Sequence, residues 1–122
     1  MTYRLPFPPS LNHMYPTVRG RRVLSSAGQR FKASVVALVL AQGRPAKPLA
    51  GRLRVEVHVY PPDRRRRDLS NLIKAVEDSL TAAGVWVDDE QVDHLTVVRR
   101  EVVAGGKVEV HVESLGPAGI YT

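Results

Sequence analysis

The stretch over residues 62–93 reads PDRRRRDLSNLIKAVEDSLTAAGVWVDDEQVD and contains the clearest helix signal in the chain. At about 100° per residue, five apolar residues within it fall on one arc roughly 100° wide. Asp68 is a suitable N-cap for this helix, and Gly84 is suited to end it. We therefore predict an amphipathic helix that buries one face. The five apolar residues are Leu69, Leu72, Ile73, Val76 and Leu80.

The sequence before this helix predicts a strand, a loop, a small hairpin and a second helix. Residues 1–5 have a strand pattern, and the prolines that follow must leave a sheet because proline donates no backbone hydrogen bond. After a loop to about Tyr15, residues 19–24 indicate a turn or hairpin around Gly20. The apolar spacing over residues 27–42 then predicts a helix, with Ser25 or Ser26 as its N-cap.

Three further strands complete the predicted sheet. Residues 51–60 alternate apolar and polar side chains, which predicts a half-buried strand. Residues 93–103 and 107–114 predict two strands joined as a hairpin by residues 104–106, where two glycines suit positive φ. The resulting fold class is α+β, a small mixed sheet with two helices packed on one face.

Length and composition set limits on the protein class. The chain has 122 residues, of which 43% are hydrophobic and 25% charged, so we expect one domain over residues 1–122. No apolar run approaches the roughly 20 residues that a membrane span needs, and we expect no membrane partner and a cytoplasmic location. The absence of cysteine excludes disulfides and thiolate metal sites. The sequence contains no glycine-rich phosphate-binding loop, so we expect no nucleotide cofactor.

Charge is distributed unevenly along the chain. The net charge is +6, and residues 1–67 hold fourteen basic against two acidic residues, whereas residues 68–122 hold four against ten. Fourteen of the 18 basic residues are arginine, whose planar guanidinium binds phosphate oxygens bidentately. Nucleic acid is therefore the favoured partner. The plainer alternative is a soluble basic domain whose charges only keep it hydrated.

Acidic residues on either side of the predicted helix suggest a metal site. A return of the chain antiparallel to the helix would bring Asp89 back towards Asp68, beside the four arginines of residues 64–67. Carboxylates with water and phosphate oxygens suit Mg²⁺, which activates water for phosphodiester hydrolysis. Lys74 would stabilise the charge that develops on the phosphate, and the arginines would hold the DNA backbone without reading its sequence.

Each of these residues also has a purely structural interpretation. Asp68 could be only an N-cap, worth about 1 kcal/mol. Lys74 and Asp78 could form a surface pair worth a few tenths of a kcal/mol, and Asp88 with Asp89 could merely open a turn. Trp86 is expected in the core, although an indole can also stack on an unpaired base. Spacing alone leaves these alternatives open.

The motif as a whole resembles the RusA family of Holliday junction resolvases. The similar positions include the arginine run with Asp68 and Leu69, and the later Gly84, Trp86 and Asp88-Asp89. The N-terminal Leu5-Pro6-Phe7-Pro8-Pro9-Ser10, the Gly20-Arg21 turn and the Gly105-Gly106 turn also match in order and spacing. Further matching residues are Asn12, Asn71, Leu72, Lys74, Asp78, Leu80, Gln91 and Val92.

The resemblance implies a RusA-like fold and a small homodimeric, Mg²⁺-dependent endonuclease, typically encoded by phages or prophages. Such an enzyme nicks two opposed strands of a four-way DNA junction in recombination and repair. The metal-binding aspartates of the family correspond to Asp68 and Asp89, and its essential lysine to Lys74. On this interpretation Arg64, Arg65, Arg66 and Arg67 bind DNA phosphates, and Asn71 is a further candidate for orienting a base or backbone group.

One position departs from the family pattern. The family commonly has a further aspartate two residues after Asp68, and here that position is Ser70, a poor magnesium ligand. Asp88, Asp93 or Glu77 could take the place of the missing aspartate as a metal ligand. Weaker cutting and a preference for Mn²⁺ also stay open. A non-catalytic junction or single-stranded DNA binding protein is the main alternative. A basic RNA-binding domain is a third, although the sequence lacks the aromatic pairs of a stacking platform.

Overall fold

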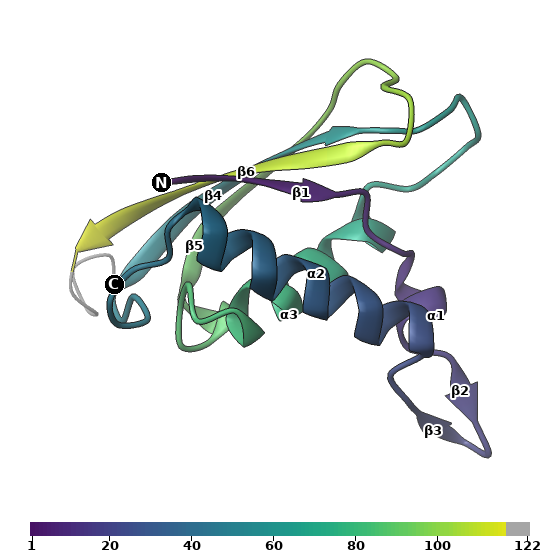
Figure 1. Cartoon of the computed structure of the whole chain (residues 1–122), viewed down its shortest axis with the longest axis horizontal. Helices are drawn as coiled ribbons and strands as arrows, with labels where there is room; N and C mark the ends of the chain where they lie inside the picture. The colour runs from purple at the N-terminus through teal and green to yellow at the C-terminus, as the bar shows by residue number, and fades with distance from the viewer. Residues whose placement is uncertain (117–122) are drawn as a thin grey trace.

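A four-stranded sheet carries its helices on one face in the computed structural model, which describes residues 1–116 (Figure 1). The strands follow the order β1-β6-β4-β5, with β4 and β5 parallel and the other neighbours antiparallel. This arrangement confirms the predicted α+β class with a mixed sheet. The strands are β1 (Thr2–Pro6), β4 (Arg52–Tyr60), β5 (Val92–Arg99) and β6 (Lys107–Gly116).

Two long helices cover the sheet, and smaller elements lie at its margins. The helix α2 follows the N-terminal segment, and α3 connects β4 to β5 (Figure 1). A separate two-stranded ribbon of β2 and β3 forms the expected hairpin around Gly20 and projects from the body of the molecule. The remaining elements are α1 (Leu11–Met14), β2 (Thr17–Val18), β3 (Arg21–Arg22), α2 (Ser26–Gln42), α3 (Ser70–Ala82) and the 3₁₀ turn η1 (Asp89–Gln91).

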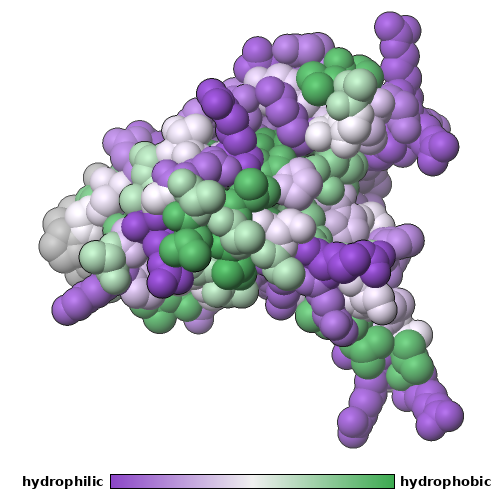
Figure 2. All heavy atoms as spheres, viewed as in Figure 1, coloured by the Kyte–Doolittle hydropathy of each residue, from purple (hydrophilic) through white to green (hydrophobic). Residues whose placement is uncertain are grey.

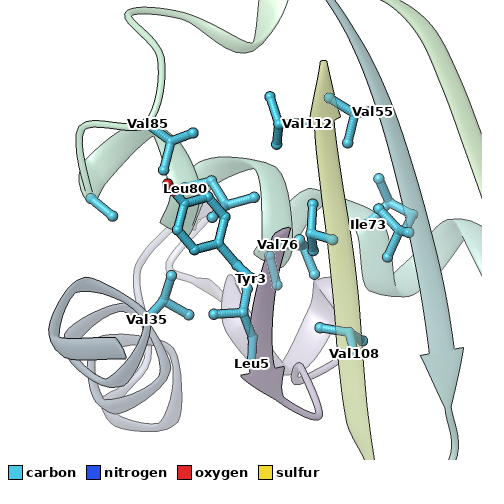
Figure 3. Close-up of a cluster of buried hydrophobic side chains, with 14 of the residues drawn as sticks. Tyr3, Leu5, Val35, Val55, Ile73, Val76, Leu80, Val85, Val108 and Val112 are labelled. Carbon is cyan, nitrogen blue, oxygen red and sulfur yellow. The ribbon is translucent and has the colours of Figure 1, made fainter. Parts of the chain in front are cut away.

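The predicted periodicities account for the core between sheet and helices. Alternate residues of β4 are at most 1% exposed, as a half-buried strand requires. The side chains of Tyr3, Val76 and Leu80 point into one cluster drawn from β1 and α3 (Figure 3). The predicted core position of Trp86 is confirmed, because it is 1% exposed and its indole NH donates to Thr81 at 2.6 Å. The buried β4 residues are Leu53, Val55, Val57 and Val59.

The start of α2 confirms one of the two predicted caps. The hydroxyl of Ser25 accepts a hydrogen bond from the backbone NH of Gly28 at 2.9 Å, which satisfies a free donor of the first turn. The helix ends at Gly43, where φ is 101°, a backbone conformation that favours glycine. Between β1 and β2, the predicted loop is wrong in part, because α1 forms there and Met14 becomes fully buried.

The predicted hairpin between the last two strands is wrong. β5 ends at Arg99 and pairs with β4, whereas β6 lies between β1 and β4, so β4 separates the two strands. The connecting loop crosses the end of β4, where the backbone NH of Val103 donates to the carbonyl of Pro61 at 2.9 Å. Gly105 and Gly106 do have positive φ, as predicted. Local turn chemistry was correct, but it does not specify which strand pairs with which.

No helix within residues 1–116 is both long and apolar enough to cross a membrane.

Replacement of Gly106 by alanine should destabilise the fold more than the same change at Gly105. A Cβ at Gly106 would lie 2.9 Å from Phe7 and 3.0 Å from Pro62, whereas the space around Gly105 is open. Both positions have positive φ, which costs an alanine about 1–2 kcal/mol, and the clash adds about 1–3 kcal/mol at Gly106 only. Urea unfolding of both variants measures the difference, and equal losses of free energy would contradict this packing.

Candidate active site

The connection β4–α3–β5 determines where the site residues lie. Because β5 runs parallel to β4, with Leu53 opposite Val92, the chain must return along α3 to the start of β4 before β5 begins. Asp89 in η1 therefore lies near the start of β4, whereas Asp68 follows the opposite end of that strand. Asp68 thus precedes α3 and Asp89 follows it, and Asp89 contacts Lys74 in the first half of that helix.

Lys74 on α3 is the centre of a small ionic cluster. Its Nζ lies 3.0 Å from Oδ1 of Asp78 and 3.2 Å from Oδ2 of Asp89. The hydrogen bond to Asp78 is the largest cause that raises the pKa of Lys74, and Asp89 adds to it. The amine is therefore a firmly charged cation, and its side chain is still 49% exposed. A cation with this exposure can contact an anionic ligand.

Two further side chains complete the surroundings of Lys74. The hydroxyl of Tyr15 donates to Oδ2 of Asp78 at 2.5 Å. Burial and this contact with Asp78 raise the pKa of Tyr15 to about 12, so the hydroxyl keeps its proton at neutral pH. Burial also raises the pKa of Glu77, and the negative charge of Asp89 adds to this shift. The cluster thus combines three carboxylates of α3 and η1 with one lysine.

A buried glutamine holds the acidic turn in place. Gln91 is 6% exposed, and its amide oxygen accepts from the backbone NH groups of Val87 and Asp88 at 2.9 and 2.8 Å. The amide nitrogen donates to the carbonyls of Leu49 and Gly51 at 2.7 and 2.8 Å. All four hydrogen-bonding positions of this side chain are therefore used, which fixes η1 against the segment before β4.

Asp88 has the structural role that the plainer interpretation gave it. Its carboxylate accepts from the backbone NH of Glu90 at 3.1 Å and, together with Gln91, forms a capping box at η1. This backbone contact is the largest cause that lowers the pKa of Asp88. Asp88 therefore shapes the turn that presents Asp89 to Lys74.

A basic groove lies beside the start of α3. It encloses about 840 Å³ between the loop after β4, the N-terminal proline segment and the start of α2. Figure 1 places the loop after β4 and the β2–β3 hairpin at the same end of the molecule, and Figure 2 shows hydrophilic side chains reaching outward from this end. Residues around the groove include Phe7, His13, Arg30, Phe31, Arg65, Arg66, Arg67, Asp68 and Asn71.

The arginine run is held in shape by its own ion pairs. Nη1 of Arg67 lies 2.7 Å from Oδ1 of Asp63. The same oxygen accepts a hydrogen bond from the backbone NH of Arg65 at 2.9 Å. The Arg67 hydrogen bond, followed by that backbone contact, lowers the pKa of Asp63 to about 2. Arg67 also lies over the ring of Phe7, 5.2 Å from its centroid. Arg64, Arg65 and Arg66 stay exposed, and Arg65 also lies 3.8 Å from a carboxylate oxygen of Asp63. Exposed guanidinium groups of this kind can bind an anion.

The structure corrects the expectation that Asp68 caps α3. The residue at the N-cap position of α3 is Leu69, no side chain caps this helix, and Asp68 contributes only its carbonyl, which accepts from Asn71 at 3.1 Å. The antiparallel return along α3 brings Arg99 to this segment, where it donates to the carbonyl of Arg67 at 2.6 Å. Asp68 is exposed and lines the groove, whereas Asp89 contacts Lys74.

The donor set is compatible with Mg²⁺ as a partly hydrated ion. Within residues 1–116 no three His, Asp or Glu side chains are grouped closely enough to hold a metal ion on their own. Mg²⁺ does not need such a cage, because it usually keeps several waters and binds one or two carboxylates together with substrate phosphates. Asp68 and Asp89 supply hard oxygen ligands beside cations that can bind those phosphates.

Comparison with known proteins gives the family of the chain. The model of the family described as Endodeoxyribonuclease RusA matches residues 6–113. The chain belongs to the RusA endodeoxyribonuclease family. Crossover junction endodeoxyribonuclease RusA of Escherichia coli K12 is 41% identical over 112 residues, and that of Enterobacteria phage 82 is 41% identical over 118 residues. Each comparison covers 92% of this chain and 92% of the relative. The predicted family resemblance is therefore confirmed.

Sequence reasoning missed several residues of this RusA-family site. Tyr15 was assigned to a loop, and nothing in its local pattern indicates a contact with Asp78, 63 positions away. Gln91 was noted only as part of the motif, although a polar residue between an acidic turn and a strand is a typical cap signal. Arg99 was taken as an ordinary strand residue. The Lys74–Asp78 pair was considered from its i,i+4 spacing, and it is present.

Replacement of Gln91 by alanine should lower the free energy of unfolding by about 2–3 kcal/mol, because it removes four part-buried hydrogen bonds to backbone groups at once. Gln42→Ala is the matched control. Gln42 makes two hydrogen bonds of 2.8 Å with the backbone of Arg4, but in an exposed position. Its loss should cost less than about 1 kcal/mol because water replaces both bonds. Denaturant unfolding compares the two, and a larger loss for Gln42→Ala would contradict the assigned role of Gln91.

Proposed function

We propose that this RusA-family chain is a crossover junction endodeoxyribonuclease that hydrolyses phosphodiester bonds at four-way DNA junctions. The observation that carries the proposal is the exposed Lys74–Asp89 pair on the same helix connection as the arginine groove. The curated relatives that carry this enzyme name are similar over 92% of the chain, which supports the same activity here. We propose one endonuclease domain over residues 1–122.

Asp68 and Asp89 are the carboxylates that we propose to hold Mg²⁺, with Mn²⁺ able to replace it. When bound, such an ion supplies an activated water and neutralises charge on the phosphate and the leaving oxygen. Water and phosphate oxygens of the DNA would complete the coordination, because Mg²⁺ usually binds only one or two carboxylates of a protein. To bind the ion, Asp89 would give up part of its contact with Lys74.

Lys74 and the arginines act on the DNA phosphates in this proposal. The charged amine of Lys74 stabilises the additional negative charge of the pentacoordinate phosphate in the transition state. Arg64, Arg65, Arg66 and Arg67 hold the backbone by charge and do not read sequence, as phosphate contacts generally do. Asn71 lines the same groove and orients the bound strand there. The groove and the cluster around Lys74 would thus act together, with Asp68 lining the groove and Asp89 in contact with Lys74.

A homodimer with twofold symmetry would place two equivalent sites on a junction that itself has twofold symmetry. Paired nicks on opposed strands then follow from one site in each subunit. This part of the proposal rests on family membership and on the symmetry of the substrate.

The second candidate function is junction binding without cleavage, which Ser70 favours. Ser70 is exposed one turn before Lys74, where the family commonly has another aspartate. Among residues 1–116 no three His, Asp or Glu side chains are grouped so that they could hold a metal ion in its place. A protein of this kind would keep the arginine groove and lose the chemistry.

Cleavage of a labelled four-way junction separates the two candidates. With Mg²⁺ or Mn²⁺ we expect paired nicks in the junction, none in a linear duplex, and none in chelator. Asp68→Asn and Asp89→Asn should each reduce cleavage at least about 100-fold while junction binding is retained, because removal of a charge-stabilising group typically costs this much. Ser70→Asp should increase cleavage. Retention of the junction without nicks in either metal would contradict the enzyme and support the binding protein.

Arg65→Ala should weaken junction binding without affecting the fold. Each lost phosphate contact lowers the slope of log affinity against log salt by about 1, and binding should weaken to a similar extent for any junction sequence. Arg54→Ala is the control, because it removes the same charge from β4, where Arg54 pairs with Glu113 outside the groove. Fluorescence anisotropy over a salt series measures both. Equal slopes for the two variants would exclude the groove as the phosphate site.

A further inference from the structure

The strongest unassigned feature of the site is the chain of contacts from Tyr15 through Asp78 to Lys74. We propose that Asp78, held by the hydroxyl of Tyr15, is a positioning residue that fixes the amine of Lys74 for the transition state. This inference rests on the proposed function, because Lys74 must act on a phosphate for its position to matter. It adds Tyr15 and Asp78 to the residues proposed to bind the metal and stabilise the phosphate, which are Asp68, Asp89 and Lys74.

The two partners of Lys74 differ in how firmly they are held. Both carboxylate oxygens of Asp78 are used, Oδ1 by Lys74 at 3.0 Å and Oδ2 by Tyr15 at 2.5 Å, and its side chain is 20% exposed. Asp89 is 31% exposed and is the carboxylate proposed to bind the metal. When Asp89 binds the ion, Asp78 is the partner that stays with the lysine.

A lysine needs such a partner more than an arginine does. Its amine is a compact charge on a flexible four-carbon stem, so a single contact leaves many rotamers available. Asp78 lies one turn further along α3, and the i,i+4 arrangement directs the stem of Lys74 along the helix. Such a pair contributes only a few tenths of a kcal/mol to stability, so its main effect is on where the amine lies.

Tyr15 is itself fixed by contacts that do not involve α3. It follows α1, and its carbonyl accepts a hydrogen bond from Arg22 of the hairpin at 2.7 Å. The neighbouring Met14 is fully buried, which anchors this segment in the core. The hydroxyl of Tyr15 is therefore presented from the N-terminal part of the chain to a carboxylate on α3. Two separate elements thus determine the position of Asp78.

Kinetics of two variants test the positioning role. Asp78→Asn and Tyr15→Phe should lower kcat for junction cleavage, by about 10- to 100-fold for the first and less for the second, as losses of supporting contacts commonly do. KM and the dissociation constant for the junction should stay unchanged, because neither residue lies in the groove. Glu113→Gln, which changes a surface carboxylate, and Tyr3→Phe, which removes a hydroxyl bond to Gly43, should keep kcat.

A second readout examines Lys74 without metal or DNA. The chain has four lysines, so Nζ–Cε correlations in NMR spectra of labelled protein give few signals to assign. The ammonium of Lys74 should exchange its protons slowly in the wild type, and Asp78→Asn should abolish this protected signal. Tyr15→Phe should weaken it, whereas Tyr3→Phe should leave it intact.

The outcomes separate this inference from the proposed function. A protected Lys74 signal that is lost in Asp78→Asn, together with a fall in kcat alone, supports the positioning role. An unchanged signal or an unchanged kcat in that variant overturns it, even if the wild type cleaves junctions. A wild type that never cleaves overturns the proposed function and this inference together, whatever the NMR result. If Asp78→Asn does not fold, Tyr15→Phe replaces it in the test, because this variant keeps the carboxylate of Asp78. The same two measurements, kcat and the ammonium signal of Lys74, are then made on it.

Discussion

Parallel pairing of β5 with β4 is the constraint on which the candidate site depends. A parallel neighbour requires a crossover, and α3 provides it by running back along β4 before β5 can begin. The acidic turn at the start of β5 must therefore lie beside the side of α3 that carries Lys74, where Asp89 reaches the amine at 3.2 Å. The side chain of Gln91 then fixes this turn with four part-buried hydrogen bonds.

The same crossover carries both groups of residues that we propose for the site. The loop that enters α3 carries the arginines and Asp68 and lines the groove, while the middle of the helix and η1 carry the ionic cluster around Lys74. Arg99, the last residue of β5, connects this strand to the loop before α3 through its hydrogen bond to the carbonyl of Arg67. The residues that we propose for phosphate binding and for phosphate chemistry are thus carried by one supersecondary unit, β4–α3–β5.

Sequence patterns predicted the parts that local physics decides. The apolar arc of α3, the alternation of β4, the Ser25 cap and the positive φ at Gly105 all follow from interactions within a few residues. The pairing of β6 with β1 and β4 does not, because strand partners are chosen by global packing, and the two glycines predicted a hairpin that is absent. For the site, the Lys74–Asp78 pair followed from helix spacing. Tyr15 could not be found, since 63 residues separate it from Asp78.

Paramagnetic relaxation by Mn²⁺ tests the central claim, that the crossover builds a site for a divalent cation, most directly. Titration of Mn²⁺ into ¹⁵N-labelled protein broadens the amide signals nearest the bound ion and needs neither DNA nor catalysis. We predict that the first signals to broaden belong to residues 88–90, Asp68 and the adjoining turns of α3. Broadening confined to another acidic region, such as Glu109 and Glu113 on β6, or uniform weak broadening throughout, would contradict the account.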